Sequence, residues 1–490
     1  MSFYDAKLLI DGTLRDAADG ARYDNVNPAT GQVIGQAPDA SLADIDEAIA
    51  AARRAFDDTD WSTNVELRVR CLRQLQAAFE TNADVVREMT VAEVGCPVGL
   101  TYAAQLDVPV TAIGYNADVL EGYRWDTDLG DARPLGIKTH RTITREPIGV
   151  VAAITPWNFP HQINLAKVIP ALAAGCTVVL KAAPATPWAA TNLARLVAEH
   201  TDFPAGVINV ITSQENAIGE VLCTDPRVDM VSFTGSTATG RKVMAAAAET
   251  LKKTFLELGG KSAFVVLDDA DAGMAAMNVA FQIMAHAGQG CAITTRLLVP
   301  RARHDEIVDA VIAMIAGIGW GDPTDPGNFM GPIISEAQRD RVLGYINDAI
   351  DDGAILALGS GKPAVLDGDL AGGFFVEPTI LVNVDQNSRV AQEEIFGPVL
   401  AVIAHDGDDD AVAIANNSIF GLSGAVVSAD VERARAVARR IRTGTISVNG
   451  GLFYSPDVPF GGYKQSGIGR EMGIAGFEEY LEIKAIAEGI

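Results

Sequence analysis

Short strand-like runs alternate with alanine-rich helical runs from about residue 148, and this alternation limits the possible folds more than any other feature. Runs rich in Val and Ile predict strands at residues 148–155, 177–183, 206–212 and 228–233. The helical runs that follow them cover residues 164–175, 187–200, 216–224 and 241–253. Such alternation is typical of βαβ units, which build a parallel, doubly wound sheet. The sequence therefore predicts an α/β protein with ligands at the carboxyl ends of the strands.

A second α/β series runs from about residue 262 to residue 450, and a chain of 490 residues is too long for one ordinary core. We therefore expect two doubly wound, Rossmann-like domains with a cleft between them. The coenzyme-binding domain is placed at residues 1–124 and 148–258, and the catalytic domain at residues 259–465. Helical periodicity also predicts helices at 42–56 and 66–80.

Two strand-like segments, 125–147 and 478–490, fall outside both series. We interpret them as an oligomerisation arm that adds to the sheet of another subunit. Hairpins on the surface of a single chain are an equally fair interpretation.

The net charge of −25 argues against nucleic acid and anionic membranes as partners. The first residues lack the apolar core of a signal peptide, and the apolar stretch 168–180 is too short to cross a bilayer. The five cysteines are odd in number and include no C-x-x-C pair, so a disulfide framework or a zinc site is not expected. These features predict a protein of the reducing cytoplasm.

The stretch "HAGQGCAITTR" places Cys291 on a Gly-Gln-Gly hinge. An apolar run at 275–285 predicts a helix before the hinge, and the run 293–300 predicts a strand after it. Such a hinge lifts a thiol out of the packing, as a nucleophile requires. Most free cysteines are small buried apolar residues, so this frame alone leaves both interpretations open.

Three further motifs carry candidate chemistry. In "FTGSTATGR", Gly235 and Gly240 lie in a strand-to-helix turn whose free N–H groups suit a phosphate, although plain turn chemistry is more common. In "LELGGKS", Glu257 ends an apolar strand, a position that suits a general base. A solvated glutamate at the strand end is the alternative interpretation. In "TPWNFP", two prolines bracket Asn158, whose side-chain amide is placed to donate a hydrogen bond to an oxyanion. A rigid turn with a helix cap is the alternative interpretation.

Together these motifs resemble the aldehyde dehydrogenase superfamily over nearly the whole chain. The matching motifs are "NPATGQVIG" near residue 27, "TPWNFP", "FTGST", "LELGGKS", "GQGC", "EEIFGP" at 393–398 and "PFGGYKQSGIGRE". The resemblance implies the aldehyde dehydrogenase fold and a homo-oligomer, either a dimer or a tetramer. It also implies a small aldehyde substrate, which is oxidised to a carboxylic acid without a metal.

The resemblance implies that Cys291 attacks the aldehyde, that Asn158 and the backbone N–H of Cys291 hold the oxyanion, and that hydride leaves to the coenzyme. Glu257 then activates the water that hydrolyses the thioester. Lys167 matches a lysine near the active site, and a lysine on a helix surface is the alternative. The coenzyme residues implied by the resemblance are Thr155, Pro156, Trp157, Lys181, Phe233, Gly235, Ser236, Gly240, Leu258, Glu394 and Phe396.

Two other activities fit the same motifs. A CoA-acylating semialdehyde dehydrogenase would pass the acyl group to CoA, but a deacylating base such as Glu257 is needed only when water is the acceptor. A binding protein on the same fold would not need Cys291, Glu257 and Asn158 together.

The sequence departs from the family pattern at the coenzyme ribose and at the substrate tunnel. Pro184 replaces a ribose-binding glutamate in "KAAP", which predicts that NAD is used and that NADP is used as well. Ala166 stands where several members carry a bulky aromatic residue. We expect "HQINLA", with His161, Gln162 and Asn164, to line that region. No obvious arginine marks the tunnel, which favours neutral aliphatic or aromatic aldehydes.

Overall fold

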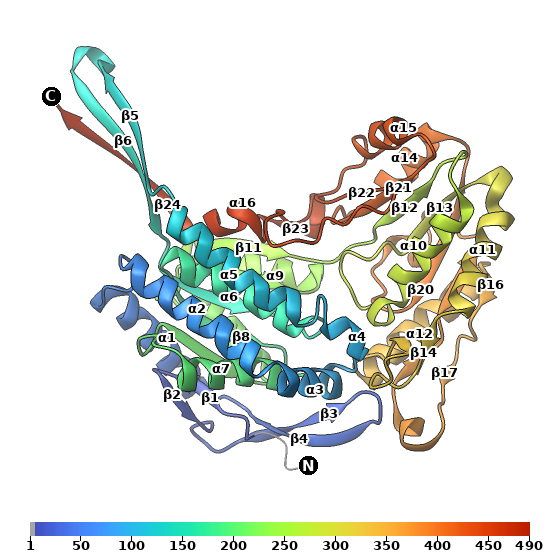
Figure 1. Ribbon diagram of the computed structural model, residues 1–490, viewed down its shortest axis with the longest axis horizontal. Helices are drawn as coiled ribbons and strands as arrows, with labels where there is room; N and C mark the ends of the chain where they lie inside the picture. Colours follow the sequence, from blue (N-terminus) through green and yellow to red (C-terminus); the bar gives the residue numbers. More distant parts are fainter. Residues whose placement is uncertain (1–4) are drawn as a thin grey trace.

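The computed structural model describes residues 5–490, and Figure 1 shows two α/β bodies with an arm of β-strands that projects from one of them. The first body contains an eight-stranded sheet. Its order is β2 (Thr13–Arg15), β1 (Leu8–Ile10), β9 (Ile208–Thr212), β8 (Thr177–Ala182), β7 (Val150–Ile154), β10 (Met230–Thr234), β11 (Lys253–Glu257) and β23 (Gly467–Ile468). The strands from β9 to β11 are parallel, as the alternating pattern predicted.

Helices cover both faces of this sheet. One apolar core lies under α2 (Val65–Thr81), α5 (Asp107–Gly122), α6 (Pro160–Ala174) and α7 (Pro187–His200). The other lies under α1 (Leu42–Asp58), α8 (Asn216–Thr224) and α9 (Thr237–Ala247). The predicted doubly wound arrangement is therefore present in this body.

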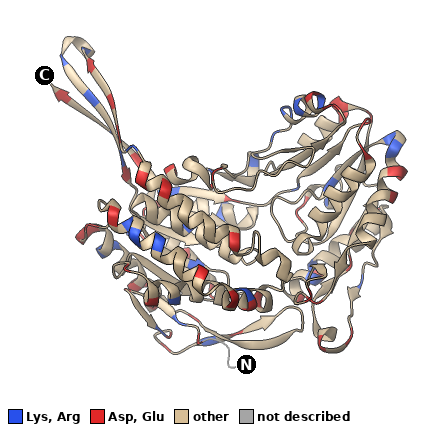
Figure 2. Cartoon of the chain, viewed as in Figure 1, with Lys and Arg blue, Asp and Glu red and all other residues tan. Residues whose placement is uncertain are grey.

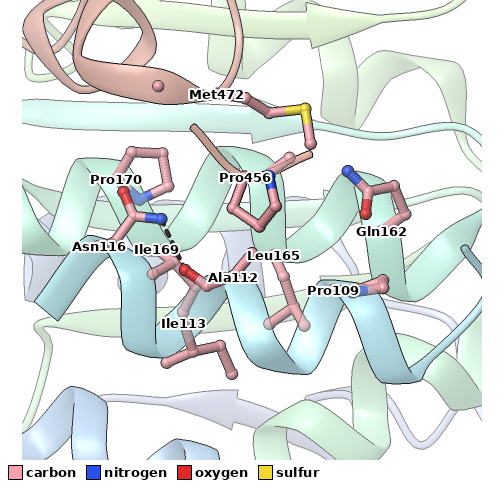
Figure 3. A pocket seen from close by; sticks show the side chains of 12 residues that line it. Pro109, Ala112, Ile113, Asn116, Gln162, Leu165, Ile169, Pro170, Pro456 and Met472 are labelled. Carbon is pink, nitrogen blue, oxygen red and sulfur yellow. Dashed lines mark hydrogen bonds between the residues drawn. The ribbon is translucent and has the colours of Figure 1, made fainter. Parts of the chain in front are cut away.

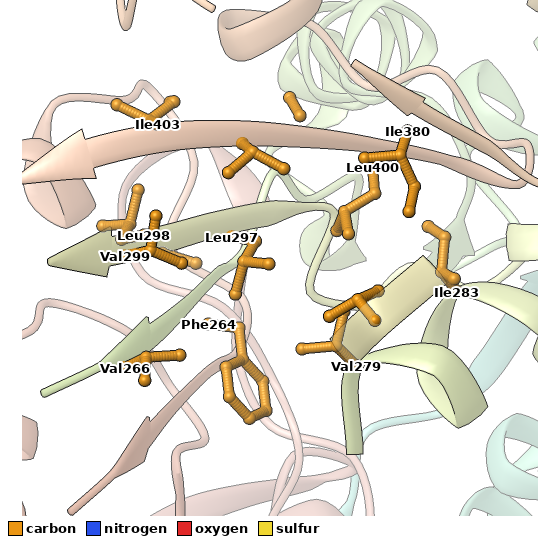
Figure 4. Close-up of a cluster of buried hydrophobic side chains, with 14 of the residues drawn as sticks. Phe264, Val266, Val279, Ile283, Leu297, Leu298, Val299, Ile380, Leu400 and Ile403 are labelled. Carbon is orange, nitrogen blue, oxygen red and sulfur yellow. The ribbon is translucent and has the colours of Figure 1, made fainter. Parts of the chain in front are cut away.

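The second body contains a seven-stranded sheet. Its order is β16 (Ile355–Leu358), β19 (Thr379–Val382), β20 (Val399–His405), β13 (Arg296–Pro300), β12 (Ala263–Val266), β21 (Gly424–Val427) and β22 (Ser447–Val448). Figure 4 shows Phe264, Leu297 and Leu400 of the central strands packed with Val279 and Ile283 of α10 (Ala272–Met284). Strands buried on both faces need continuous apolar runs, which explains why these segments show no polar alternation.

The chain passes from one sheet to the other immediately after Glu257 and later returns. Gly259 and Gly260 connect β11 to β12, and β23 pairs with β11 near the end of the chain, so that Glu257 is opposite Gly467. The returning segment therefore lies against the strand that ends in the candidate base. The strand after the candidate nucleophile begins at Arg296, so the prediction of a strand from residue 293 was wrong at its first three residues.

The projecting arm is a separate three-stranded antiparallel sheet. Its order is β24 (Leu481–Gly489), β6 (Thr139–Pro147) and β5 (Asp126–Ala132). Large apolar side chains on it are exposed, including Leu135, Ile137 and Ile483. The arm contributes little to either core.

Charged side chains lie mainly on the outer helices and loops, where Figure 2 shows acidic and basic residues interspersed. Among residues 5–490, no helix is long and apolar enough to cross a membrane.

Arg296 fixes the start of the strand that follows the nucleophile. Its side chain is 1% exposed and donates to the carbonyl oxygens of Lys261, Ile414 and Ala415 at 2.9, 3.0 and 2.8 Å. These bonds tie the turn after Glu257 and the end of α14 (Asp408–Asn416) to β13. Burial lowers the pKa of the guanidinium to about 10, which leaves it charged at neutral pH.

We predict that Arg296→Met destabilises the protein by at least ~2 kcal/mol, because the buried carbonyl groups of Lys261 and Ala415 lose their donor at about 1–3 kcal/mol each. The carbonyl of Ile414 keeps the N–H of Asn417 as a donor. Arg301→Met is the matched control, since that side chain is 63% exposed in its ion pair with Asp406, and such pairs are worth about 1 kcal/mol or less. Urea unfolding followed by tryptophan fluorescence measures both. Equal unfolding midpoints for the two variants would contradict the prediction.

Candidate active site

The loop that carries Cys291 begins with a left-handed turn. After α10, the residues His286, Ala287 and Gly288 have φ angles of 47°, 52° and 70°. This conformation costs about 1–2 kcal/mol for each residue with a side chain. At Gly288 a Cβ atom would lie 2.1 Å from the carbonyl oxygen of Gly397, so glycine is required there.

Gln289 holds this turn in place. Its buried side chain donates to the carbonyl oxygens of His286 and Pro332 at 2.9 and 3.2 Å, and it accepts from the N–H of Ile334 at 2.9 Å. Two of these bonds fasten the turn to residues 332–334 of the second body. The nucleophile therefore sits on a fixed backbone, not on a mobile loop.

Cys291, Glu257 and Asn158 line one cavity of about 270 Å³ between the two bodies. Glu257 ends β11, and Asn158 follows the carboxyl end of β7. The sheet thus delivers both residues to the same edge, as parallel strands do. Most of the remaining wall is apolar and includes Phe159, Ile163, Ile293, Phe453, Phe460 and Met472.

Cys291 is partly exposed, whereas the other four cysteines are buried. Burial raises the pKa of its thiol, and the negative charges of Glu257, Glu394 and Glu471 raise that pKa further. The thiol is therefore protonated at neutral pH and needs a base to become a nucleophile.

Glu257, the candidate base, has no fixed partner among the described residues. It is 2% exposed, and among the described residues neither carboxylate oxygen has a hydrogen-bond partner. Burial raises its pKa well above the usual value, and the negative charge of Glu471 adds to this, whereas Lys167 acts in the opposite direction. The raised pKa makes the ionised Glu257 carboxylate a stronger base than an ordinary glutamate.

Lys167 is buried, so the interpretation of it as a helix-surface lysine was wrong. Its Nζ lies 2.8 Å from Oε1 of Glu471, which lines the cavity, and 3.3 Å from Oγ of Ser232. Glu471 lies in the matched motif "GIGRE", but no sequence pattern indicates that it pairs with Lys167.

Hydrogen bonds orient Asn158 through its side-chain amide and its backbone carbonyl. Its Nδ2 donates to the carbonyl oxygen of Gln289 at 2.9 Å, and its backbone carbonyl accepts from Nε2 of Gln105 at 2.9 Å. An amide nitrogen carries two N–H groups, so one remains to donate into the cavity that Asn158 lines.

The predicted phosphate turn packs tightly around its glycines. A Cβ atom on Gly235 would lie 2.5 Å from the ring of Phe233, and one on Gly240 would lie 2.5 Å from Leu258. Ser236 is exposed at the amino end of α9, where its hydroxyl accepts from the N–H of Thr239 at 3.2 Å. Phe233 and Leu258 thus form the floor on which the turn rests.

Coenzyme candidates from the two bodies meet across the cleft. The rings of Trp157 and Phe396 are in edge contact at 5.3 Å. Oε1 of Glu394 accepts from the N–H of Gly260 at 2.9 Å, and burial raises the Glu394 pKa to about 7.

The remaining candidates lie at the carboxyl ends of β7 and β8. Lys181 is partly buried there, which lowers its pKa. The N–H of Thr155 donates to the Lys181 carbonyl at 3.1 Å, and Pro156 follows in the turn.

Only part of "HQINLA" faces the substrate cavity. Gln162 lines it, but His161 and Asn164 do not, so that expectation was wrong for these two residues. His161 is buried against Oγ1 of Thr90 at 2.9 Å, and Asn164 accepts from Oγ1 of Thr155 at 2.6 Å. Residues three apart share a helix face, and this face of α6 packs away from the cavity.

Three supporting residues escaped the sequence analysis: Glu471, Gln289 and Gly260. Each acts through a contact with a residue far away in the chain, which no local pattern reveals. Among residues 5–490, no group of three or more His, Cys, Asp or Glu side chains is arranged to hold a metal ion.

Comparisons with known proteins agree with this site. The model of the "Aldehyde dehydrogenase family" matches residues 15–486. A 3-succinoylsemialdehyde-pyridine dehydrogenase from a Pseudomonas species is 42% identical over 476 residues, which is 95% of each chain. The crystal structure of Staphylococcus aureus betaine aldehyde dehydrogenase with NAD⁺ superposes with a TM-score of 0.95 at 36% identity, covering 99% of this chain and 94% of that one.

A Mycobacterium tuberculosis aldehyde dehydrogenase complexed with NAD⁺ gives a TM-score of 0.93 at 40% identity, covering 98% of this chain and 97% of that one. The family model, the relative and both structures span nearly the full chain, and the chain therefore belongs to the aldehyde dehydrogenase family.

Proposed function

We propose that the protein oxidises a neutral aldehyde to a carboxylic acid with NAD as the hydride acceptor, using Cys291, Glu257 and Asn158. The observation that carries this proposal is their meeting in one apolar cavity, where Cys291 is the only cysteine among the described lining residues. Both solved structures compared above contain NAD⁺, which supports the choice of coenzyme.

The described residues suit the proposed chemistry step by step. The Cys291 thiol gives its proton to solvent, and its sulfur then forms a bond to the aldehyde carbon. The free N–H of Asn158 and the backbone N–H of Cys291 stabilise the resulting oxyanion. Loss of hydride leaves a thioester on Cys291. Glu257 then takes a proton from water, and that water releases the carboxylic acid.

The proposed coenzyme site fits NAD. The close contact at Gly235 keeps the turn before α9 free of a side chain, and the amino end of that helix suits a pyrophosphate. Gly240 lies inside α9, not in the turn where the sequence pattern placed it, and packs against Leu258. Lys181 and Glu394 would hold the two riboses. When bound, the nicotinamide ring accepts the hydride.

The cavity wall favours a neutral aldehyde. Among the described residues, no lysine or arginine lines it, so nothing there would pair with a substrate carboxylate. The Pseudomonas relative is named for a pyridine-bearing semialdehyde, which supports an aromatic or aliphatic body on the substrate.

The first body, from residues 1–124 and 148–258, is proposed to bind coenzyme, and residues 259–465 to supply the nucleophile. The arm formed by 125–147 and 478–490 is proposed to join subunits into a dimer or tetramer, because its exposed Leu135, Ile137 and Ile483 would be covered there. A cytoplasmic setting is supported by the five free cysteines.

We predict that Cys291→Ala abolishes aldehyde oxidation, because alanine offers no attacking atom. Coenzyme affinity, measured by fluorescence titration, stays within about twofold of the parent. Cys223→Ala is the matched control and retains turnover, since Cys223 lies in α8, is buried in an apolar core and does not line the cavity. Normal turnover by Cys291→Ala would refute the nucleophile assignment.

We predict that Glu257→Gln gives one burst of reduced coenzyme and then turns over ~10²–10⁴-fold more slowly, because thioester hydrolysis loses its base. In the parent, kcat rises with increasing pH, since burial raises the Glu257 pKa and the active carboxylate forms only as pH increases. The variant loses this dependence. Rapid mixing and a pH series measure both, and loss of the burst would show that Glu257 acts mainly on Cys291.

We predict that NADP is also used and that Pro184→Glu shifts the preference toward NAD. A carboxylate ~4 Å from a 2′-phosphate would repel it by about 1 kcal/mol in water and ~4 kcal/mol near a protein surface, which is roughly 10- to 1,000-fold. Pro184 is exposed and has no such charge. The kcat/KM values for both coenzymes test this, and a parent without NADP activity would contradict it.

A further inference from the structure

The substrate side and the coenzyme side of the active site are supported in different ways. On the substrate side, Figure 3 shows Pro456 and Met472 lying above α6, around a narrow space of about 20 Å³. That space has room for about one water molecule, so direct packing fixes Met472, which also lines the cavity of Cys291. On the coenzyme side, residues 394–397 form a loop that belongs to no helix or strand. We call it the coenzyme loop.

The coenzyme loop has an unfavourable backbone and no backbone support. Phe396 has a left-handed φ of 62°, which is unfavourable for any residue other than glycine. Among residues 5–490, no backbone N–H donates to the carbonyl oxygens of Glu394, Ile395 or Phe396. The loop therefore needs side chains to hold it in one conformation, and α12 (Glu336–Asp351) supplies them.

Two side chains of α12 hold all three carbonyl groups. The terminal nitrogens of Arg341 donate to the carbonyl oxygens of Ile395 and Glu394, both at 2.7 Å. Nε2 of Gln338 donates to the carbonyl oxygens of Ile395 and Phe396 at 3.1 and 2.9 Å. Residues three apart lie on the same face of a helix, so both side chains reach the loop together.

The amino end of α12 also supports the turn before the nucleophile. The side chain of Gln289 accepts from the N–H of Ile334 at 2.9 Å, two residues before the helix begins. Gly397 packs against the helix, since a Cβ atom on it would lie 2.5 Å from Val342. Its carbonyl oxygen lies so close to Gly288 that a Cβ atom there would be 2.1 Å away. The coenzyme loop and the nucleophile turn are therefore placed relative to each other by one helix end.

We propose that Arg341 and Gln338 are positioning residues for hydride transfer. Through the backbone carbonyls they keep Glu394 and Phe396, two of the proposed coenzyme contacts, at a fixed place relative to Cys291. The inference rests on the function proposed above. A displacement of about 1 Å at the reacting atoms can cost ~100-fold in rate, so loss of either support slows hydride transfer.

The two residues separate the effect of position from the effect of charge. Burial raises the Glu394 pKa to about 7, and the positive charge of Arg341 acts in the opposite direction. Arg341→Met removes both this charge and the hydrogen bonds to the loop. Gln338→Met removes hydrogen bonds alone, because glutamine is neutral. A slower rate in both variants therefore points to the position of the loop.

The test uses the full-length enzyme in excess over benzaldehyde, with NAD at saturation, and follows the formation of reduced coenzyme in one turnover. Arg341→Met should lower this rate about 10- to 100-fold, and Gln338→Met about tenfold. Benzaldehyde deuterated at the aldehyde carbon should slow both variants further, because hydride transfer limits them. Arg339→Met is the matched control and should keep the parent rate. Arg339 lies on the same helix but donates to the carboxylates of Glu336 and Asp340.

Two further measurements need no turnover. NAD affinity, followed by fluorescence titration, should weaken in Arg341→Met and Gln338→Met, because the contacts at Glu394 and Phe396 lose their fixed position. Alkylation of Cys291 by iodoacetamide, without NAD, should keep the parent rate in both variants, because Gln289 still holds the nucleophile turn.

The proposal is overturned if both variants keep the parent rate of hydride transfer, or if Arg339→Met loses as much. It is also overturned if Cys291 alkylation falls in step with that rate, since the nucleophile turn would then have moved. A loss in Arg341→Met alone would assign the effect to charge and overturn it too. Should Arg341→Met not fold, Gln338→Met decides.

Failure of the proposed function has a different signature. A parent enzyme that forms no reduced coenzyme from either benzaldehyde or propanal refutes the proposed function itself. A parent that oxidises these aldehydes, with variants that match its rate, refutes only the positioning role of Arg341 and Gln338.

Discussion

The site depends on keeping a carboxylate in an apolar cavity without a direct cationic partner. Glu257 has no hydrogen-bond partner among the described residues, and the nearest lysine, Lys167, is paired with Glu471 at 2.8 Å. Had Lys167 paired with Glu257 instead, its charge would have lowered the Glu257 pKa and made a weaker base. Glu471 thus pairs with this positive charge. Its own negative charge raises the pKa of Glu257, whereas Lys167 lowers it.

The backbone around the nucleophile is strained on one side and braced on the other. His286 and Ala287 adopt an unfavourable left-handed conformation, and the bonds of Gln289 offset this by fixing the turn against Pro332 and Ile334. Arg296 braces the downstream side through backbone carbonyl groups alone. Because the Gln289 carbonyl also receives the Asn158 amide, the same turn sets the position of both the thiol and the proposed oxyanion donor.

Fully buried strands were predictable from sequence, and long-range polar contacts were not. Of the run 293–300 that was predicted as a strand, residues 296–300 form one, because burial on both faces requires apolar residues throughout. The family resemblance indicated Cys291, Glu257 and Asn158. The resemblance left open whether Lys167 is buried, because the partner of Lys167, Glu471, lies 304 residues away in the chain. The orientations of His161 and Asn164 likewise depend on what packs against α6, which the order of residues alone does not specify.

The returning C-terminal segment couples base strength to substrate selection. Glu471 and Met472 are consecutive residues that both line the cavity, and Glu471 also pairs with Lys167. Met472 has a left-handed φ of 63°, so its backbone is constrained while its unbranched side chain remains adaptable. Substitutions that preserve this backbone can therefore reshape the wall without moving Glu471. Those that shift the backbone would disturb the ion pair and, through it, the pKa of Glu257. Substrate range in this enzyme should thus evolve more readily at Gln162, on the rigid helix α6, than at Met472.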